Sequence, residues 1–320
     1  MNFWVFNSPK KDKTNMPKVL YRAKNFRRAT LDQIETANRI IDEYTALGYD
    51  LTLRQLYYQM VARNHIENSE KSYKNFGNIV DDGRLAGLID WERIVDRTRN
   101  LRGNTHFSDP SDVMRRAAHW YRTDRWQEQD TRCEVWVEKD ALIGIVERVC
   151  ARLDVDYFAC RGYNSQSEMW SAAQRFVQYR KLGYRRIVVV HLGDHDPSGI
   201  DMTRDIVDRM QMFGASVEVK RIALNWEQIE QYKPPPNFAK LTDTRSKAYV
   251  KQFGNSSWEL DALEPTMIGR LIETTVAQYI DRPAWNDAER EEKTGRDQLL
   301  DVARRWHDVV TWLEEEREAF

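Results

Sequence analysis

The sequence predicts an α/β protein, with a helical N-terminal domain followed by a domain built on a mainly parallel sheet flanked by helices. Two observations predict this order. Apolar residues recur with a helical period between about residues 30 and 86, and from Cys133 short apolar runs alternate with helical stretches. The chain has 320 residues, 41% of them hydrophobic, which is enough for two domains with cores of their own.

Residues 1–28 form a basic segment in which Asp12 is the only acid. Pro9 and Pro17 discourage a continuous helix there. The sequence therefore predicts a flexible basic arm, which either contacts DNA or is a solvated tail without a partner.

Residues 29–132 are expected to form a DNA-binding domain followed by a connector. In the first helix one face carries Ile34, Ala37, Ile40, Ile41 and Tyr44. Thr30 or Asp32 is expected to cap this helix and Gly48 to end it. Further helices are predicted over Thr52–Arg63 and Ser69–Ala86, and the alternation over Leu88–Val95 predicts a small hairpin.

Three helices followed by such a wing predict a winged helix-turn-helix (CAP-like) domain. Its third helix, which carries Lys71, Lys74 and Arg84, is expected to enter or follow a DNA groove. Arg97 and Arg99, in the polar connector over residues 96–132, are further candidates for phosphate contacts.

Residues 133–320 are expected to hold the sheet domain and a C-terminal helical extension. Strands are predicted over Cys133–Val137, Val155–Cys160, Arg186–Leu192 and Val217–Ala223. The helices between them are predicted near Ala141–Arg152, Ser167–Leu182 and Gly199–Phe213. One long C-terminal helix is expected to carry Leu299, Ala303, Trp306, Val310 and Leu313 on one face.

Charge, cysteine content and apolar run length indicate where DNA would bind, which metal site is not expected and where the protein is located. Residues 1–132 hold 23 Lys and Arg against 18 Asp and Glu, whereas the whole chain has a net charge of -1, which favours the N-terminal part as the DNA-binding face. Three cysteines without a C-x-x-C pair, and six histidines without zinc-site spacing, predict reduced core thiols and no zinc site. Since apolar runs such as Ile187–Val190 are too short for a membrane span, we expect an intracellular protein, in the cytoplasm or at the nucleoid.

Acidic residues follow two of the predicted strands at the point where each strand ends. Glu138 follows the first strand, and Asp194 and Asp196 follow the third. Because ligands bind beyond the carboxyl ends of parallel strands, we expect these carboxylates to converge on a hard divalent cation, Mg²⁺ or alternatively Mn²⁺. Taken singly, each acid is more simply a helix cap or a surface charge. The order of a strand-end glutamate and a D-x-D-P-x-G turn favours the metal site.

Glu138 followed by the run Asp194-His195-Asp196-Pro197-Ser198-Gly199 resembles the Toprim domain, the metal-binding module of topoisomerases, primases and some nucleases. The run over 52–58, Thr-Leu-Arg-Gln-Leu-Tyr-Tyr, resembles the catalytic stretch of topoisomerase VI A subunits and of the meiotic break-forming transesterase. The resemblance extends over residues 30–280 and includes the acidic-aliphatic run over 258–263.

The resemblance implies that Tyr58 is the nucleophile and that Arg54, one helical turn earlier, steadies a phosphate. It also implies Gly162 as a DNA contact, although the loop over 161–167 lacks the family's Pro-Asp and Thr-Arg. The implied reaction is magnesium-dependent breakage of double-stranded DNA through a 5'-phosphotyrosyl link, made by a homodimer in which Tyr58 of one protomer works with the acids of the other. The chain resembles the short, stand-alone mini-A type. It carries no Walker A motif, so an ATPase activity would need a separate subunit.

Two alternatives stay open. Tyr57 and Tyr58 are equally consistent with a packed core, in which case the acids would serve a nuclease that uses water. The chain is also consistent with a DNA-binding module whose active site has decayed.

Overall fold

The computed structural model describes residues 18–94, 106–160, 165–238 and 246–318. Three predicted DNA-contacting residues, Arg97, Arg99 and Gly162, lie outside these ranges. The chain divides into two compact units, here called the helical unit and the sheet unit. The helical unit comprises Met1–Thr98, Asp194–Pro197 and Leu224–Met267, and the sheet unit comprises Arg99–Gly193, Ser198–Ala223 and Ile268–Phe320. This division differs from the predicted boundary at residue 133, because segments far along the chain join the N-terminal helices.

Three N-terminal helices form the core of the helical unit: α1 (Arg28–Ala46), α2 (Leu53–Ala62) and α3 (Glu70–Leu85). The predicted apolar face of α1 is buried in full, with Ile34, Ala37, Ile40, Ile41 and Tyr44 at most 3% exposed. Thr52 caps α2 in a capping box with Gln55, and Ser69 caps α3, as helix-start chemistry favours. The N-terminal caps expected for α1, Thr30 or Asp32, were wrong, because that helix begins earlier, after Arg27, with no side-chain cap bond. Its end is as expected: Gly48 follows the C-cap Leu47 with a positive φ of 79°.

The segment after α3 is irregular where a hairpin was predicted. Within the described residues 88–94 there are turns and one isolated parallel bridge, between Leu51 and Ile94. Local side-chain bonds explain the difference: Asp90 accepts a hydrogen bond from the Glu92 amide, and Arg84 donates to the carbonyl of Ile94. The alternation therefore buries single apolar residues such as Ile89 in the helical core without forming strands.

Residues 18–27, the described end of the predicted arm, lie along the C-terminal end of α3. The amides of Tyr21 and Arg22 both donate to the carbonyl of Leu85, and Lys24 forms an ion pair with Asp82. This part of the basic segment is held in place by these bonds.

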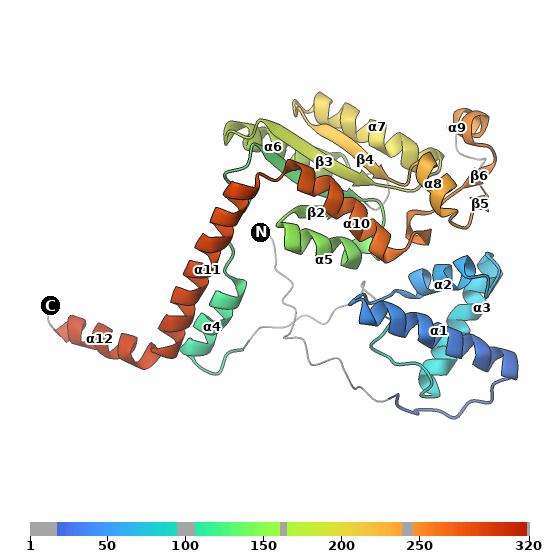
Figure 1. Ribbon diagram of the computed structural model, residues 1–320, viewed down its shortest axis with the longest axis horizontal. Helices are drawn as coiled ribbons and strands as arrows, with labels where there is room; N and C mark the ends of the chain where they lie inside the picture. Colours follow the sequence, from blue (N-terminus) through green and yellow to red (C-terminus); the bar gives the residue numbers. More distant parts are fainter. Residues whose placement is uncertain (1–17, 95–105, 161–164, 239–245, 319–320) are drawn as a thin grey trace. The chain divides into compact units, whose positions relative to one another are not determined.

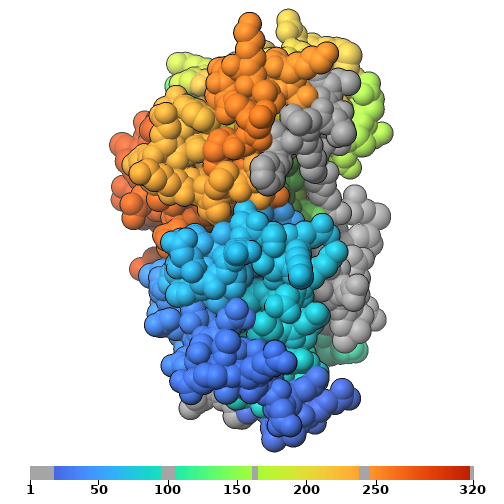
Figure 2. Space-filling model, turned by 90° about the vertical axis from the view of Figure 1, so that its right-hand side faces the viewer, coloured from blue at the N-terminus to red at the C-terminus, as the bar shows by residue number. Residues whose placement is uncertain are grey.

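The second part of the helical unit follows the sheet in sequence. It contains α8 (Trp226–Tyr232), β5 (Asn237–Phe238), α9 (Ser246–Phe253), β6 (Ser256–Ser257) and the short 3-10 helix η2 (Leu260–Ala262). β5 and β6 pair antiparallel, and Ala262 packs among the core residues of α1–α3. In Figure 2 this segment, in yellow to orange, lies against the cyan surface of the N-terminal helices.

The sheet unit is built on four parallel strands in the order β2-β1-β3-β4, which confirms the predicted parallel sheet. The strands are β1 (Thr131–Val137), β2 (Asp156–Ala159), β3 (Arg186–Leu192) and β4 (Glu218–Ala223). β1 and β3 are central and almost wholly buried, which suits their runs of Val and Ile.

Helices cover both faces of this sheet (Figure 1). α6 (Gln166–Lys181) and α7 (Pro197–Met212) share one core with Trp136, Ile187 and Val189 of the strands. The 3-10 turn η1 (Asp140–Leu142) leads into α5 (Ile143–Leu153), which packs against β1. The sequence placed all three of these crossover helices correctly.

The C-terminal extension differs from the single helix that was predicted. α10 (Pro265–Val276) and η3 (Ala277–Tyr279) are followed by α11 (Arg282–Arg304) and α12 (Trp306–Glu318), with the break at Arg305. α11 packs against α4 (Pro110–Trp120), the helix of the predicted connector. Of the face that was expected to be apolar, Ala303 is buried, whereas Leu313 is 42% exposed. None of the helices described is both long and apolar enough to cross a membrane.

Candidate functional site

The carboxyl ends of β1 and β3 form the point at which the sheet order reverses. β1 is followed in sequence by its neighbour on one side, β2, and β3 by its neighbour on the other side, β4. Glu138 leaves the end of β1 and its amide donates to the carbonyl of Leu192, the last residue of β3. Since such a switch point is where open α/β sheets bind ligands, Glu138 and the loop that starts at Gly193 leave the sheet at the expected edge.

Gly193 allows the Glu138 carboxylate to approach the backbone at this edge. A Cβ atom on Gly193 would lie 3.0 Å from Oε2 of Glu138 and 3.1 Å from Nη1 of Arg221, closer than ordinary contacts. A side chain at this position would therefore push the carboxylate or the guanidinium away.

Arg221 of β4 bonds to both ends of the loop that carries the two aspartates. Its Nη2 donates to the carbonyl of Gly193 at 2.9 Å, and its Nη1 donates to the carbonyl of Gly199 at 2.9 Å. Nη1 also lies 3.2 Å from Oγ1 of Thr203. The guanidinium therefore bonds to the sheet unit on both sides of residues 194–197.

His191 lies behind this loop in the interior of the sheet unit. It is fully buried, and its Nδ1 lies 2.9 Å from Oγ1 of Thr203. Burial, with the charge of Arg221 in second place, lowers the pKa of His191 to about 3, so the imidazole is neutral at physiological pH. The sequence did not identify His191 and Arg221 as site residues. Each lies within a strand, where a polar residue is usual on one of the two alternating faces.

The loop carrying the aspartates is held equally firmly in the helical unit. Oδ1 of Asp194 accepts a hydrogen bond from the Leu260 amide at 2.8 Å, and Asp194 is 7% exposed. His195 and Trp258 exchange two backbone hydrogen bonds. This arrangement orients one oxygen of Asp194 through the backbone of η2.

His195 is a structural residue at the centre of an aromatic cluster. Its ring lies within 6 Å of the rings of Trp226, Tyr249, Phe253 and Trp258, and its Nδ1 is 2.8 Å from the Tyr249 hydroxyl. The histidine between the two aspartates therefore points into the core, where it anchors the loop.

Tyr57 and Tyr58 of α2 differ in their surroundings. The hydroxyl of Tyr57 accepts from the Ser69 amide at 2.9 Å and lies 3.1 Å from the Ser69 carbonyl, so it organises the turn between α2 and α3. The side chain of Tyr58 bonds to that of Asn237 in β5, and Tyr58 is 4% exposed. Tyr57 thus packs within the N-terminal helices, whereas Tyr58 contacts Asn237.

Arg54 lies beside Tyr58 on α2, with its Cζ 5.7 Å from the centre of the Tyr58 ring. It forms ion pairs with Glu259 and with Asp261, the second through Nε at 2.9 Å. Burial by itself would lower the pKa of Arg54, but the charges of Asp261 and Glu259 raise it above its usual range. The acidic-aliphatic run over 258–263 is therefore joined to the tyrosine helix.

Asp261 and Glu259 also change the pKa of Tyr58, the nucleophile that the resemblance implies. Burial, then the charges of Asp261 and Glu259, raises the pKa of Tyr58 to about 12, against the lowering effect of Arg54. A pKa of about 12 leaves the phenol protonated at neutral pH. Arg54 favours the phenolate, but its effect is outweighed in this arrangement.

The predicted DNA contacts on α3 fall into two classes. Lys71 and Lys74 are exposed, and Lys74 pairs with Glu70 one turn earlier. Arg84 instead directs Nη2 at the Ile94 carbonyl and covers the Trp91 ring, and burial lowers its pKa. The two lysines remain available to a phosphate backbone, whereas Arg84 stabilises the loop after α3.

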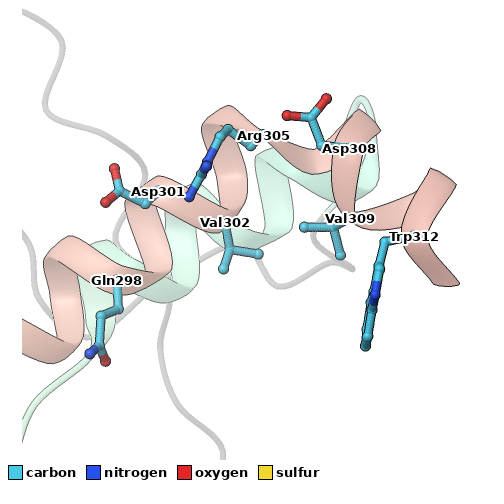
Figure 3. A pocket seen from close by; sticks show the side chains of 7 residues that line it. All are labelled: Gln298, Asp301, Val302, Arg305, Asp308, Val309 and Trp312. Carbon is cyan, nitrogen blue, oxygen red and sulfur yellow. The ribbon is translucent and has the colours of Figure 1, made fainter.

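Two hollows in the described part of the chain lie elsewhere. One of about 460 Å³ lies at the bend between α11 and α12, where Val302, Val309 and Trp312 line its apolar side (Figure 3). Another of about 640 Å³ lies beside the α2–α3 turn and is lined by residues of 61–68 and by Lys233, Pro235 and Pro236. Neither gathers the acids or the tyrosines discussed above.

Across the described ranges, no three His, Cys, Asp or Glu side chains form a group able to hold a metal ion. Glu138, Asp194 and Asp196 nonetheless offer carboxylate oxygens, the kind of ligand that a hard cation takes. Searches of family models, of curated proteins and of solved structures return no match to this chain.

Proposed function

We propose that the chain is a DNA strand-breaking transesterase with Tyr58 as nucleophile and Mg²⁺ held by Glu138, Asp194 and Asp196. One observation carries the proposal: Glu138 and the loop with Asp194 follow adjacent strands, β1 and β3, at the switch point of a parallel sheet. On this proposal the sheet unit belongs to a Toprim domain, and α1–α3 belong to a winged-helix DNA-binding domain.

In the proposed reaction, the Tyr58 oxygen attacks a DNA phosphorus and the bond to the 3'-oxygen breaks. The phenolic proton is lost and the 3'-oxygen gains one, so a phosphotyrosyl ester replaces one phosphodiester and no ATP is consumed. When bound, Mg²⁺ would stabilise negative charge on the phosphate and the leaving oxygen. Arg54 steadies the phosphate beside Tyr58, and Lys71 and Lys74 bind the backbone further along.

The proposal requires the Tyr58 hydroxyl to become accessible, since Tyr58 is 4% exposed and bonded to Asn237. The same observation favours a second candidate, a metal-dependent nuclease in which water attacks and Tyr58 only packs.

The deciding experiment incubates the protein with supercoiled plasmid and Mg²⁺ or Mn²⁺, stops the reaction with denaturant and measures protein attached to DNA ends. The proposal expects attachment at 5' ends that disappears with Tyr58→Phe and persists with Tyr57→Phe, the matched control. Cleavage without attachment, unchanged by Tyr58→Phe and lost with Glu138→Ala, would establish the nuclease. Binding without any cleavage would identify a DNA-binding module.

A homodimer with active sites shared between protomers is part of the proposal. Neither Tyr58→Phe nor Glu138→Ala should cleave alone. Mixed dimers of the two variants regain one complete site if tyrosine and acids come from different protomers, and none if both come from one. Nicking by the mixture would support the shared site, and its absence despite subunit exchange would refute it. A strand-passage reaction driven by ATP would require a separate ATPase subunit.

A further inference from the structure

Arg54 has two acidic partners that differ in burial. The Asp261 side chain is 0% exposed and holds Nε of Arg54 at 2.9 Å. The Glu259 side chain is 25% exposed and bonds to Nη2, a terminal nitrogen of the guanidinium. The two acids therefore contact different nitrogens of one cation.

Asp261 is fixed by its neighbours in η2. Ala262 packs into the core of α1–α3, and the Leu260 amide bonds to Asp194. A cation beside a buried carboxylate offsets the cost of its burial, so losing this pair would be costly. Of the two acids, Asp261 is therefore the more firmly held beside Arg54.

Glu259 is less enclosed than Asp261. It precedes η2 and its side chain is 25% exposed, against 0% for Asp261, so solvent weakens its ion pair with Arg54. The terminal nitrogens of a guanidinium bind carboxylate and phosphate in the same forked geometry. A DNA phosphate can therefore take the position of Glu259 while Asp261 keeps Arg54 in place.

We propose that Glu259 is an internal competitor for the phosphate-binding edge of Arg54, and that Asp261 is a positioning residue that holds this guanidinium beside Tyr58. The inference rests on the proposed strand-breaking function. It assigns opposite effects to two acids separated by one residue. Until a phosphate displaces Glu259, two carboxylates face the one guanidinium beside Tyr58.

The test measures binding of a short DNA duplex in the Tyr58→Phe background, where no covalent link can form. Glu259→Gln should tighten binding about two- to fivefold at low salt, the range that a partly exposed ion pair is worth. The dependence of log Kd on log salt should steepen by up to about 0.9, the contribution of one added phosphate contact. Glu230→Gln, an exposed glutamate of α8 in the same unit, makes the same charge change and should have a smaller effect.

A double-mutant cycle shows whether the effect passes through Arg54. In an Arg54→Met background Glu259→Gln should no longer tighten binding, and Asp261→Asn should weaken binding in the parent background. Asp261→Glu should restore part of that binding, because it keeps the charge. Unchanged or weaker binding by Glu259→Gln, an equal gain by Glu230→Gln, or a gain that persists with Arg54→Met would overturn the inference.

The two proposals can be refuted independently of each other. If covalent attachment depends on Tyr58 but Glu259→Gln does not tighten binding, the competitor is refuted and the transesterase stands. If Glu259→Gln tightens binding through Arg54 but no attachment forms in the Tyr58 parent, phosphate competition stands and the transesterase is refuted.

Discussion

Replacing Arg221 by methionine should weaken metal binding as well as folding. Arg221 donates to the carbonyls of Gly193 and Gly199 at 2.9 Å each, so methionine removes two charge-assisted hydrogen bonds at the ends of the aspartate loop. Hydrogen bonds to charged groups are worth about 1.5–3 kcal/mol each. Because Arg221 is only partly buried, solvent weakens these bonds, and we expect a loss of about 2–4 kcal/mol in the free energy of unfolding.

In the proposed function the loop that carries Asp194 and Asp196 holds the metal, so a change in this loop should change the affinity for metal. Partners that orient metal ligands typically contribute about 10- to 100-fold to affinity, and this is the expected loss for Arg221→Met in a Mn²⁺ titration followed by electron paramagnetic resonance. Arg186→Met is the matched control, since Arg186 pairs with Glu218 at the opposite end of the sheet and both side chains are about half exposed. Urea unfolding of both variants supplies the stability values. Mn²⁺ affinity equal to that of the parent in a folded Arg221→Met variant would refute the reasoning.

Three further predictions concern the sheet unit. Gly193→Ala should lower Mn²⁺ affinity with little loss of stability, because its Cβ would press on the Glu138 carboxylate; unchanged affinity would contradict this. The neutral, buried His191 should make the protein less stable in acid. Its contribution to the free energy of unfolding is present above the unfolded pKa of about 6.5 and is lost as the pH falls and the unfolded chain takes up a proton, by about 2 kcal/mol at pH 5. Urea titrations of His191→Gln should not show this loss. Arg175→Met should cost about 3 kcal/mol, because the buried carboxylate of Glu134 would keep its hydrogen bond from Trp136 but lose its cation. The double variant with Glu134→Met should recover most of this loss, as denaturation midpoints would show.

Local sequence was sufficient for the elements whose signals lie within one turn or one strand. Thr52 and Gln55 mark the start of α2, and the spacing of Arg54 and Tyr58 places both side chains on one helical face. The β-branched run Ile187–Val190 identifies a buried central strand. Such signals failed after α3, where alternation over Leu88–Val95 looked like a hairpin although Arg84 and Asp90 bond the backbone into turns.

By itself the sequence determined the helical and parallel-sheet composition, the order of the strands along the chain and the position of Glu138 and Asp194 at strand ends, because periodicity and strand-end spacing are local properties. Only the tertiary structure decided which charges meet. Arg54 pairs with Glu259, 205 residues further along the chain, and Arg221 donates to the carbonyls of the two glycines that flank the aspartate loop. Ion pairs and hydrogen bonds depend on distance in space, and no local pattern records that a carboxylate from η2 will raise the pKa of a tyrosine on α2.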